Sequence, residues 1–532
     1  MDFVVTLTRL QAFDFKGWGM LSAIFGKKSD NPLADIKSAQ ALLDDLPKND
    51  AFRSLAELTE LIELLSGQND FKLDHHFAVL RLFDEAAQPY VRKMVREYFT
   101  PFELSKFQEN RLWLTLGNWS RHVSNAYFRV FNAYCNGEKG ASAIKAQLPL
   151  LNARAVHAVM WQLKYVCSHY GQVDSASWVH LAQLYKHAEQ LQYLDVPVSL
   201  YPGMIGNTSV QCEVGDLMVW FDSGLSALSP LYIHLIERIV SHYRSCINIH
   251  AEISQHSRLS FDLNRPSEPT RINMGATTHP AMRFIGMPAM QSRLEELMKV
   301  LKKNIVPDEI SLGGTYEAEV VKNATQYLLN YVIAPPVRRN ARRTANVTLS
   351  VVDGFDKVVE RTGAGLHFGA STEQPAHWVT EEISAGGFSA TVAAKGNGSI
   401  GIGSLLGIQP EGVPHWGIAV VRRLLRDDAK NQLRVGAQIL SNQIAGVVLN
   451  QNRIPGGAIE NGQPALWLYA KQNDASGEAQ LLMSADTFSL GRSLQIQLDG
   501  KNYLLMPNGL QEKGLDYDLA KFRFVVQEAG ED

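Results

Sequence analysis

The sequence has few cysteines, little net charge and no long apolar run without charged residues. Its 4 cysteines among 532 residues are Cys135, Cys167, Cys212 and Cys246, which lie far apart and outside any CxxC or Cys/His spacing. Neither a zinc site nor a disulfide framework is expected, and reduced thiols in a cytoplasmic protein are the simplest interpretation. The first residues, with Asp2 and no basic stretch before an apolar one, do not match a signal peptide.

The near balance of charge excludes a protein whose main role is to coat DNA or RNA. Lysine and arginine number 51 against 54 acidic residues, a net charge of -3. Any affinity for phosphate must therefore come from a local cluster. The most apolar helical stretch, residues 217–240, contains Asp222, Glu237 and Arg238. Because charged side chains are costly in hydrocarbon, no transmembrane helix is expected.

One segment near the start has an amphipathic character. It begins with Phe15, contains Trp18 and Phe25, and ends with Lys28. Such a segment could make a peripheral contact with an anionic membrane surface. Its three glycines weaken an isolated helix, which favours a mobile arm or a helix that docks on its own protein.

The chain is too long for one core, and its residue patterns divide it into parts. Apolar residues recur at helical spacing from about residue 33 to residue 256, between short Gly, Asn, Asp or Pro breaks, which is typical of an antiparallel helical array. We predict a multidomain α + β fold with a helical array or bundle followed by an antiparallel β-barrel and a further strand-rich unit. The expected divisions are an arm (1–32), a helical domain (33–256), a connector with helices (257–336), a barrel (337–450) and a strand-rich unit (451–532).

After Pro336 the apolar pattern changes to period two. Alternation is seen at 347–351, 388–392, 435–439 and 494–498, and the last run is followed by Asp499-Gly500, a strong hairpin signal. Since no helices are expected between these strands, the pattern favours a closed antiparallel barrel or paired barrels over a parallel sheet.

The densest cationic cluster lies directly before the first of these strands. It reads Arg338-Arg339-Asn340-Ala341-Arg342-Arg343. Arginine forks bind phosphate oxygens in pairs and hydrogen-bond to guanine edges, so a phosphorylated guanine-containing ligand would fit. The alternative interpretation is a solvated basic linker.

A second element follows about forty residues later. It reads Glu382-Ile383-Ser384-Ala385-Gly386-Gly387 and leads into the strand at 388–394. A carboxylate and a hydroxyl two residues apart on an extended segment point to the same side, and the glycines permit a tight turn.

An RxxxR element before the first strand, with a (D/N)xSxxG-like element entering a later strand, resembles the PilZ domain of bacterial cyclic di-GMP receptors. The late strands at 415–423 and 433–440 are similar to that family as well. The resemblance covers residues 337–440 and implies a β-barrel that binds cyclic di-GMP, without a further cofactor or a metal.

The resemblance implies specific ligand-binding residues. Two arginine pairs have the required spacing, Arg338 with Arg342 and Arg339 with Arg343. Glu382 takes the Asp/Asn position, Ser384 the serine position, and Gly386 and Gly387 the glycine turn, with Gly387 as the final glycine. The leading hypothesis is a non-enzymatic receptor whose helical domain relays the ligand signal to a protein partner.

Two other classes stay open. Glu382 is one methylene longer than aspartate, which favours a ligand-independent scaffold or adaptor with a PilZ-like barrel. An enzyme in the helical part would need a deep pocket lined by perturbed carboxylates or histidines. The sequence contains no P-loop or zincin helix. We interpret Gly396-Asn397-Gly398-Ser399-Ile400-Gly401 as a hairpin loop because no helix follows it, and Asp74-His75-His76 as ordinary residues of a helix.

Overall fold

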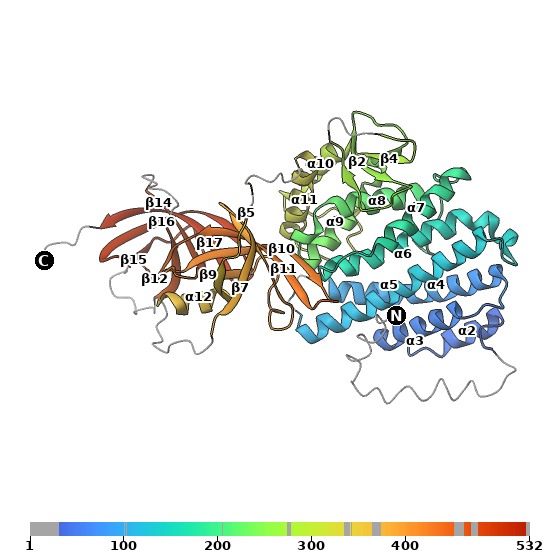
Figure 1. Ribbon diagram of the computed structural model, residues 1–532, viewed down its shortest axis with the longest axis horizontal. Helices are drawn as coiled ribbons and strands as arrows, with labels where there is room; N and C mark the ends of the chain where they lie inside the picture. The colour runs from blue at the N-terminus through green and yellow to red at the C-terminus, as the bar shows by residue number, and fades with distance from the viewer. Residues whose placement is uncertain are drawn as a thin grey trace.

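Most of the helices lie in one half of an elongated molecule, and most of the strands lie in the other (Figure 1). The computed structural model describes residues 31–100, 102, 104–204, 206–273, 278–334, 341, 343–363, 374–451, 462–469 and 477–527. The predicted fold class, a helical array followed by antiparallel barrels, is confirmed. Arg338, Arg339, Arg342 and the segment from Phe15 to Lys28 lie outside the described residues.

The helical half is a stack of amphipathic helices with side-chain caps at most of their starts. Ser105 forms a capping box with Gln108 at the start of α5, and Asp174 accepts a hydrogen bond from the amide of Ala176 at the start of α7. The apolar faces join in one core. The helices are α2 (Ile36–Asp44), α3 (Ala51–Ser66), α4 (Leu73–Tyr98), α5 (Lys106–Cys135), α6 (Leu148–Ser168), α7 (Ser175–Gln190), α8 (Val210–Asp222) and α9 (Pro230–His242), with 3-10 turns η2 (Ala141–Gln147), η3 (Leu225–Ala227) and η4 (Arg244–Cys246).

The segment for which we expected a connector packs into this same core. A four-stranded sheet of order β1-β4-β2-β3 lies beside helices α10 and α11. Leu259 of β2, Leu294 of α10 and Leu328 of α11 are buried in the helical core. The elements are β1 (Asn248–His250), β2 (Ser257–Asp262), β3 (Thr270–Arg271), β4 (Met282–Gly286), α10 (Met290–Leu301) and α11 (Ala318–Ile333).

The first barrel is closed by antiparallel pairs in the ring β6-β7-β8-β11-β10-β9, and β5 adds to the edge of β7. Alternate residues such as Phe388, Ala390 and Val435 fill its interior, as the period-two pattern predicts. The strands are β5 (Arg343–Thr344), β6 (Thr348–Asp353), β7 (Ala376–Ser384), β8 (Gly387–Ala393), β9 (Leu405–Pro410), β10 (Gly417–Asp427) and β11 (Gln432–Ser441).

A second closed barrel follows and repeats the same strand connectivity, in the ring β12-β13-β14-β17-β16-β15. The last strand-rich unit therefore stands as a barrel of its own. Asp499 and Gly500 form the predicted two-residue hairpin turn with φ of 51° and 75°. The strands are β12 (Ile444–Gln451), β13 (Gln463–Leu468), β14 (Glu478–Ser484), β15 (Leu494–Leu498), β16 (Lys501–Lys513) and β17 (Tyr517–Gln527).

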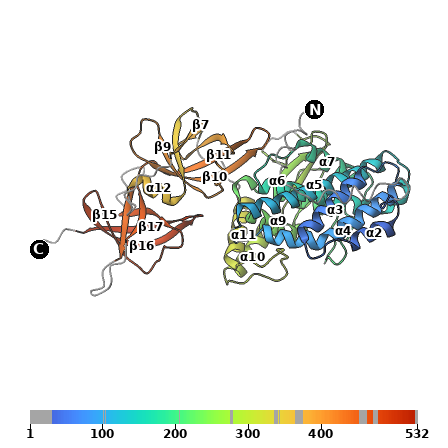
Figure 2. The ribbon, with the colours of Figure 1, turned by 90° about the horizontal axis from the view of Figure 1, so that it is seen from below.

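A short helix that the sequence reading did not anticipate lies between the barrels (Figure 2). This helix, α12 (Phe355–Thr362), buries Phe355, Val358 and Val359 in a cluster that both barrels share. Its first amide, that of Phe355, donates to Asp516 Oδ2 at 2.6 Å. The expectation of strands without intervening helices is wrong at this point, because eight residues are too few for a clear periodic signal.

The two halves meet where the first barrel contacts α5 and the end of α6. The amide of Arg426 donates to Tyr170 O at 2.7 Å, and Lys106 Nζ donates to Gly398 O at 2.7 Å. The Tyr170 side chain packs against the barrel core. Gly398 belongs to the loop that we predicted to be a hairpin. That prediction is wrong, because β8 and β9 are not paired with each other and the loop crosses the barrel end.

Two further sequence predictions concern α4 and the membrane. Asp74 and His75 are partly exposed and His76 is buried, as expected for ordinary residues of an amphipathic helix. Within the described ranges, no helix is both long and apolar enough to cross a membrane.

Candidate ligand-binding site

The Glu382–Ser384 element forms the end of β7 and the start of a tight hairpin. Ile383 packs on the barrel core, so Glu382 and Ser384, on either side of it, share the outer face. Ser384 pairs with Gly387 across a two-residue turn, and Ser384 Oγ donates to Gly387 O at 3.2 Å. The expected common direction of the carboxylate and the hydroxyl is therefore borne out by the alternation of the strand.

The structure brings the end of the arginine cluster next to this hairpin. On β5, Arg343 pairs with Ile383 and Thr344 pairs with Glu382. The Arg343 side chain is exposed. The other three arginines of the cluster lie outside the described residues, so both arginine registers stay open. Two elements about forty residues apart in sequence are adjacent strands here.

Gly387 has a packing role that the resemblance did not indicate. A Cβ atom at this position would lie 2.3 Å from the carbonyl oxygen of Ala437 on β11. Because that oxygen belongs to a paired backbone strand, it has little freedom to move. The close approach of β8 to β11 thus requires glycine even without a ligand. The assignment of Gly386 and Gly387 to ligand binding stays a prediction.

We expect Gly387→Ala to lower the free energy of unfolding by about 1–3 kcal/mol, the cost typical of overpacking a core. Gly398→Ala is the matched control, because a Cβ there meets nothing within 4 Å. Chemical denaturation of both variants checks this. Equal stability of the two would show that β8 and β11 can separate at no cost.

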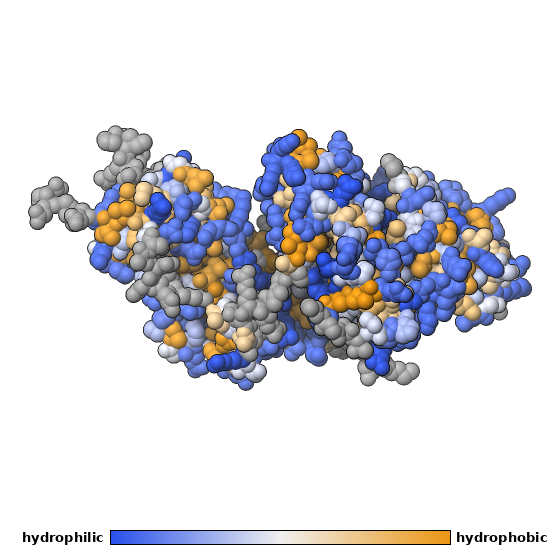
Figure 3. Space-filling view, turned by 90° about the horizontal axis from the view of Figure 1, so that it is seen from above, coloured by the Kyte–Doolittle hydropathy of each residue, from blue (hydrophilic) through white to orange (hydrophobic). Residues whose placement is uncertain are grey.

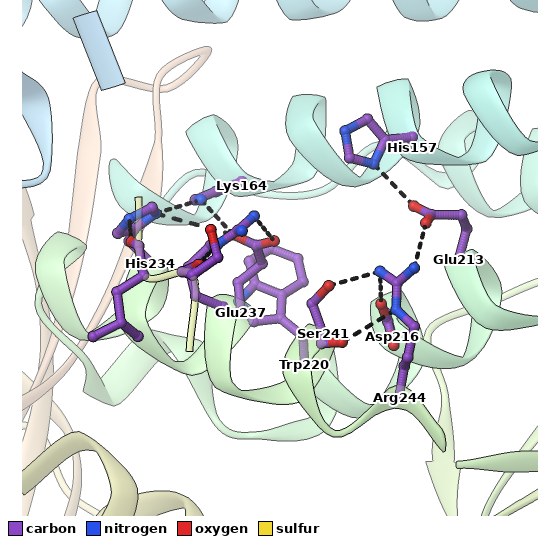
Figure 4. Close-up of polar contacts among 12 residues, drawn as sticks. His157, Lys164, Glu213, Asp216, Trp220, His234, Glu237, Ser241 and Arg244 are labelled. Carbon is purple, nitrogen blue, oxygen red and sulfur yellow. Dashed lines mark hydrogen bonds and ion pairs between the residues drawn. The ribbon is translucent and has the colours of Figure 1, made fainter. Parts of the chain in front are cut away.

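The helical half holds buried charges that the sequence reading missed (Figure 4). Lys164 Nζ lies 2.7 Å from both Glu237 Oε2 and His234 Nδ1. His234 Nε2 is 2.9 Å from Leu312 O. Burial and the Lys164 charge keep the pKa of His234 well below its ordinary value. A neutral His234 therefore accepts from Lys164 and donates to the carbonyl.

A second buried network joins α6, α8 and η4 and is drawn in the same view. Arg244 bonds Asp216 Oδ2 at 2.6 Å and lies 3.3 Å from Glu213 Oε1. His157 Nδ1 is 2.9 Å from Glu213 Oε2. Burial tends to raise the pKa of Glu213, but His157 and Arg244 hold it below its usual range. Residues this far apart in sequence, on α6, α8 and η4, give no local motif by which they could be predicted.

These networks connect α6 with α8 and α9, and α8 with η4. A small hollow of about 20 Å³ near the end of α8 has room for about one water molecule. It contains Asp222, whose pKa is raised to about 6 by burial although Arg271 opposes the shift. No cluster suited to a metal ion occurs among the residues that the structure describes.

Comparison with known proteins gives one similarity, and it lies in the helical half. Residues 37–252 match the family model described as "Cyclic-di-GMP receptor FimW, N-terminal domain". This stretch runs from α2 to just beyond β1. The family that this model describes is one of cyclic di-GMP receptors, and the model covers less than half of the chain. It does not cover residues 337–440, where the PilZ resemblance stays a prediction. No curated protein and no solved structure matches the chain.

Proposed function

We propose that this protein is a cyclic di-GMP receptor that binds the dinucleotide on the outer face of its first barrel. The observation that carries the proposal is the pairing of β5 with β7, which sets Arg343 beside the Glu382–Ser384 hairpin. Arginine forks supply phosphate and guanine contacts, while the carboxylate and hydroxyl supply polar contacts to a base. The family match at residues 37–252 supports the same ligand class from an independent part of the chain.

The location of the arginine segment suggests how binding would be relayed. The segment lies between the end of α11 at Ile333 and the start of β5 at Arg343, the covalent link between the two halves. A ligand clamped there would favour one arrangement of the barrel relative to the helices, provided that it binds that arrangement better. The helical half would then present a changed surface to a protein partner.

Calorimetric titration of the full chain with cyclic di-GMP tests the proposal. We expect binding at micromolar concentration or tighter, and at least tenfold weaker binding for Arg343→Ala or for the paired Arg339→Ala, because each removes a charge-assisted hydrogen bond. If the other arginine pair binds the ligand, we expect the loss of affinity in Arg338→Ala and Arg342→Ala instead. Arg293→Ala, which removes an exposed arginine of α10, is the control for net charge.

A ligand-independent scaffold is the second candidate. The observation that favours it is that Ser384 and Gly387 already have structural roles, in the turn hydrogen bond and in the close packing on β11. The same titration separates the two candidates. A folded protein that shows no heat of binding, or whose four arginine variants all bind like the parent, would contradict the receptor proposal and leave the scaffold.

A further inference from the structure

The outer face of the first barrel continues from the hairpin across three more strands. In register, Glu382 of β7 opposes Ser389 of β8, Ser389 opposes Gly436 of β11, and Gly436 opposes Arg423 of β10. With neighbouring strands ~4.8 Å apart, this row spans about 14 Å. Only a serine and a glycine stand between the two charged ends. We call this row the trough, because its two middle residues have small side chains while its ends carry a carboxylate and a guanidinium.

A hydroxyl without a partner lies in this row. Phe388 and Ala390 point into the barrel core, so Ser389 between them faces outward. Yet its side chain is only 4% exposed, and Ser389 Oγ has no hydrogen-bond partner in the described part of the chain. An unpaired buried hydroxyl is unfavourable. A polar ligand atom in the trough would give it a partner.

The cation at the far end is available for a ligand, unlike its sequence neighbour. Arg422 donates to Glu512 Oε1 at 2.7 Å and to Gln438 Oε1 at 2.9 Å, so it holds the two barrels together. Arg423 is exposed, and its guanidinium makes no hydrogen bond or ion pair with the residues that the structure describes. Guanidinium groups with free donors bind phosphate oxygens in pairs.

Arg423 also faces the helical half. Its strand β10 contacts η3, and Gly224, just before η3, accepts a 3.4 Å hydrogen bond from Tyr327 Oη of α11. Tyr327 stacks on Tyr331 with a ring distance of 6.0 Å. Burial raises the pKa of Tyr327 to about 12 and also raises that of Tyr331, and the charge of Arg423 opposes both shifts. The surface is indented where the two halves meet (Figure 3).

We propose that Arg423 binds a phosphate group of the ligand at the far end of this trough, next to the Tyr327–Tyr331 wall of α11. The inference rests on the proposed function and deepens it, because Arg343 and Arg423 then provide one cation near each end of the site. A cyclic dinucleotide, with two phosphates and two bases, suits such a face. The ligand would contact the strand-rich half and lie against the helical half. Its binding would therefore act directly on the relative position of the two halves.

Titration of the full chain with cyclic di-GMP tests this. We expect Arg423→Ala to bind about ten- to a hundredfold more weakly than the parent, the effect of one charge-assisted hydrogen-bond pair. Arg423→Lys, which keeps the charge and loses the fork, should fall between. Arg523→Ala, which removes an exposed arginine from β17 of the second barrel, should leave the affinity unchanged. Because Arg423 has no described partner, its variants should melt at the parent temperature.

Ser389→Ala gives an independent readout. It removes an unpaired hydroxyl, so the ligand-free melting temperature should stay equal or rise, while the ligand-induced increase should shrink. The inference would be overturned, and the proposed function left intact, if the parent binds cyclic di-GMP and Arg423→Ala binds it with an affinity within twofold of the parent. Absence of binding by the parent would overturn both. Equal affinity for inorganic phosphate and cyclic di-GMP would show a simple anion site and overturn the two-ended trough.

Discussion

Glu237→Leu is expected to lower the free energy of unfolding by about 3–5 kcal/mol at neutral pH, as loss of one partner of a buried ion pair typically does. Glu237 Oε2 lies 2.7 Å from Lys164 Nζ, and the two side chains are 5% and 1% exposed. The variant leaves the ammonium group of Lys164 buried, with the neutral His234 and the rings of Phe99 and Trp161 near it but without the Glu237 carboxylate. Chemical denaturation of the full chain, followed by circular dichroism of the helices, measures the change.

The pKa of Glu237 determines how its contribution to stability changes with pH. Burial opposes ionisation of Glu237, but Lys164 and Arg238 lower its pKa to about 2. Its contribution to stability is therefore present above the unfolded value near 4.5 and is lost as pH falls toward about 2. In the variant, burial lowers the pKa of Lys164 without a carboxylate to oppose it, so the unfolded state binds more protons. The variant's stability should then rise with pH toward 10.5, a trend that the parent shows more weakly.

The control for Glu237→Leu is Glu319→Ala on α11. Glu319 forms an exposed ion pair with Lys322, and such pairs contribute less than about 1 kcal/mol. A Glu237→Leu variant that loses no more stability than Glu319→Ala would contradict the account of a buried charge network that holds α6 against α9.

Arg154→Met is expected to cost about 3–5 kcal/mol for the same physical reason at a second place. Arg154 is 1% exposed and donates to Glu85 Oε1 at 2.6 Å and to Leu200 O at 2.7 Å. Its guanidinium lies 3.8 Å from Asp84 Oδ2, which is equally buried. Without Arg154 the carboxylate of Asp84 keeps hydrogen bonds from Tyr127, Tyr201 and Gln88.

A double-mutant cycle measures this coupling. Burial raises the pKa of Asp84 and Arg154 opposes that shift, so removal of Arg154 should raise it further. Replacing the carboxylate as well, in Arg154→Met with Asp84→Asn, should therefore recover part of the lost stability. Strictly additive losses would mean that Asp84 and Arg154 do not interact across the α4–α6 contact.

Much of the fold followed from local pattern. Helical spacing predicted the helical array over residues 33–256, and period-two alternation predicted β6, β8, β11 and β15 with the Asp499-Gly500 turn. These predictions succeed because the residues of one helix face or one strand face recur at a fixed short spacing along the sequence. Helix α12 was not predicted because it is short. The hairpin prediction for the loop at Gly398 was wrong because it assumed that strands adjacent in sequence pair with each other.

The candidate site divides in the same way. The arginine cluster and the Glu382–Ser384 element were visible in the sequence because each occupies adjacent positions. Ser389, Gly436 and Arg423 were not, because they are joined only by the strand register of a closed barrel. The buried partners Lys164 and Glu237 were hidden similarly, on helices about seventy residues apart.

The sequence alone therefore determined the kinds of elements, the change from helix to strand after Pro336 and the cationic segment at that junction. Only the tertiary structure decided that β5 lies against β7, that the barrel face leads from Glu382 to Arg423, and that this face turns toward α11. The physical reason is that periodicity and turn chemistry act over a few residues, whereas register, barrel closure and burial of charge depend on which distant segments exclude water together.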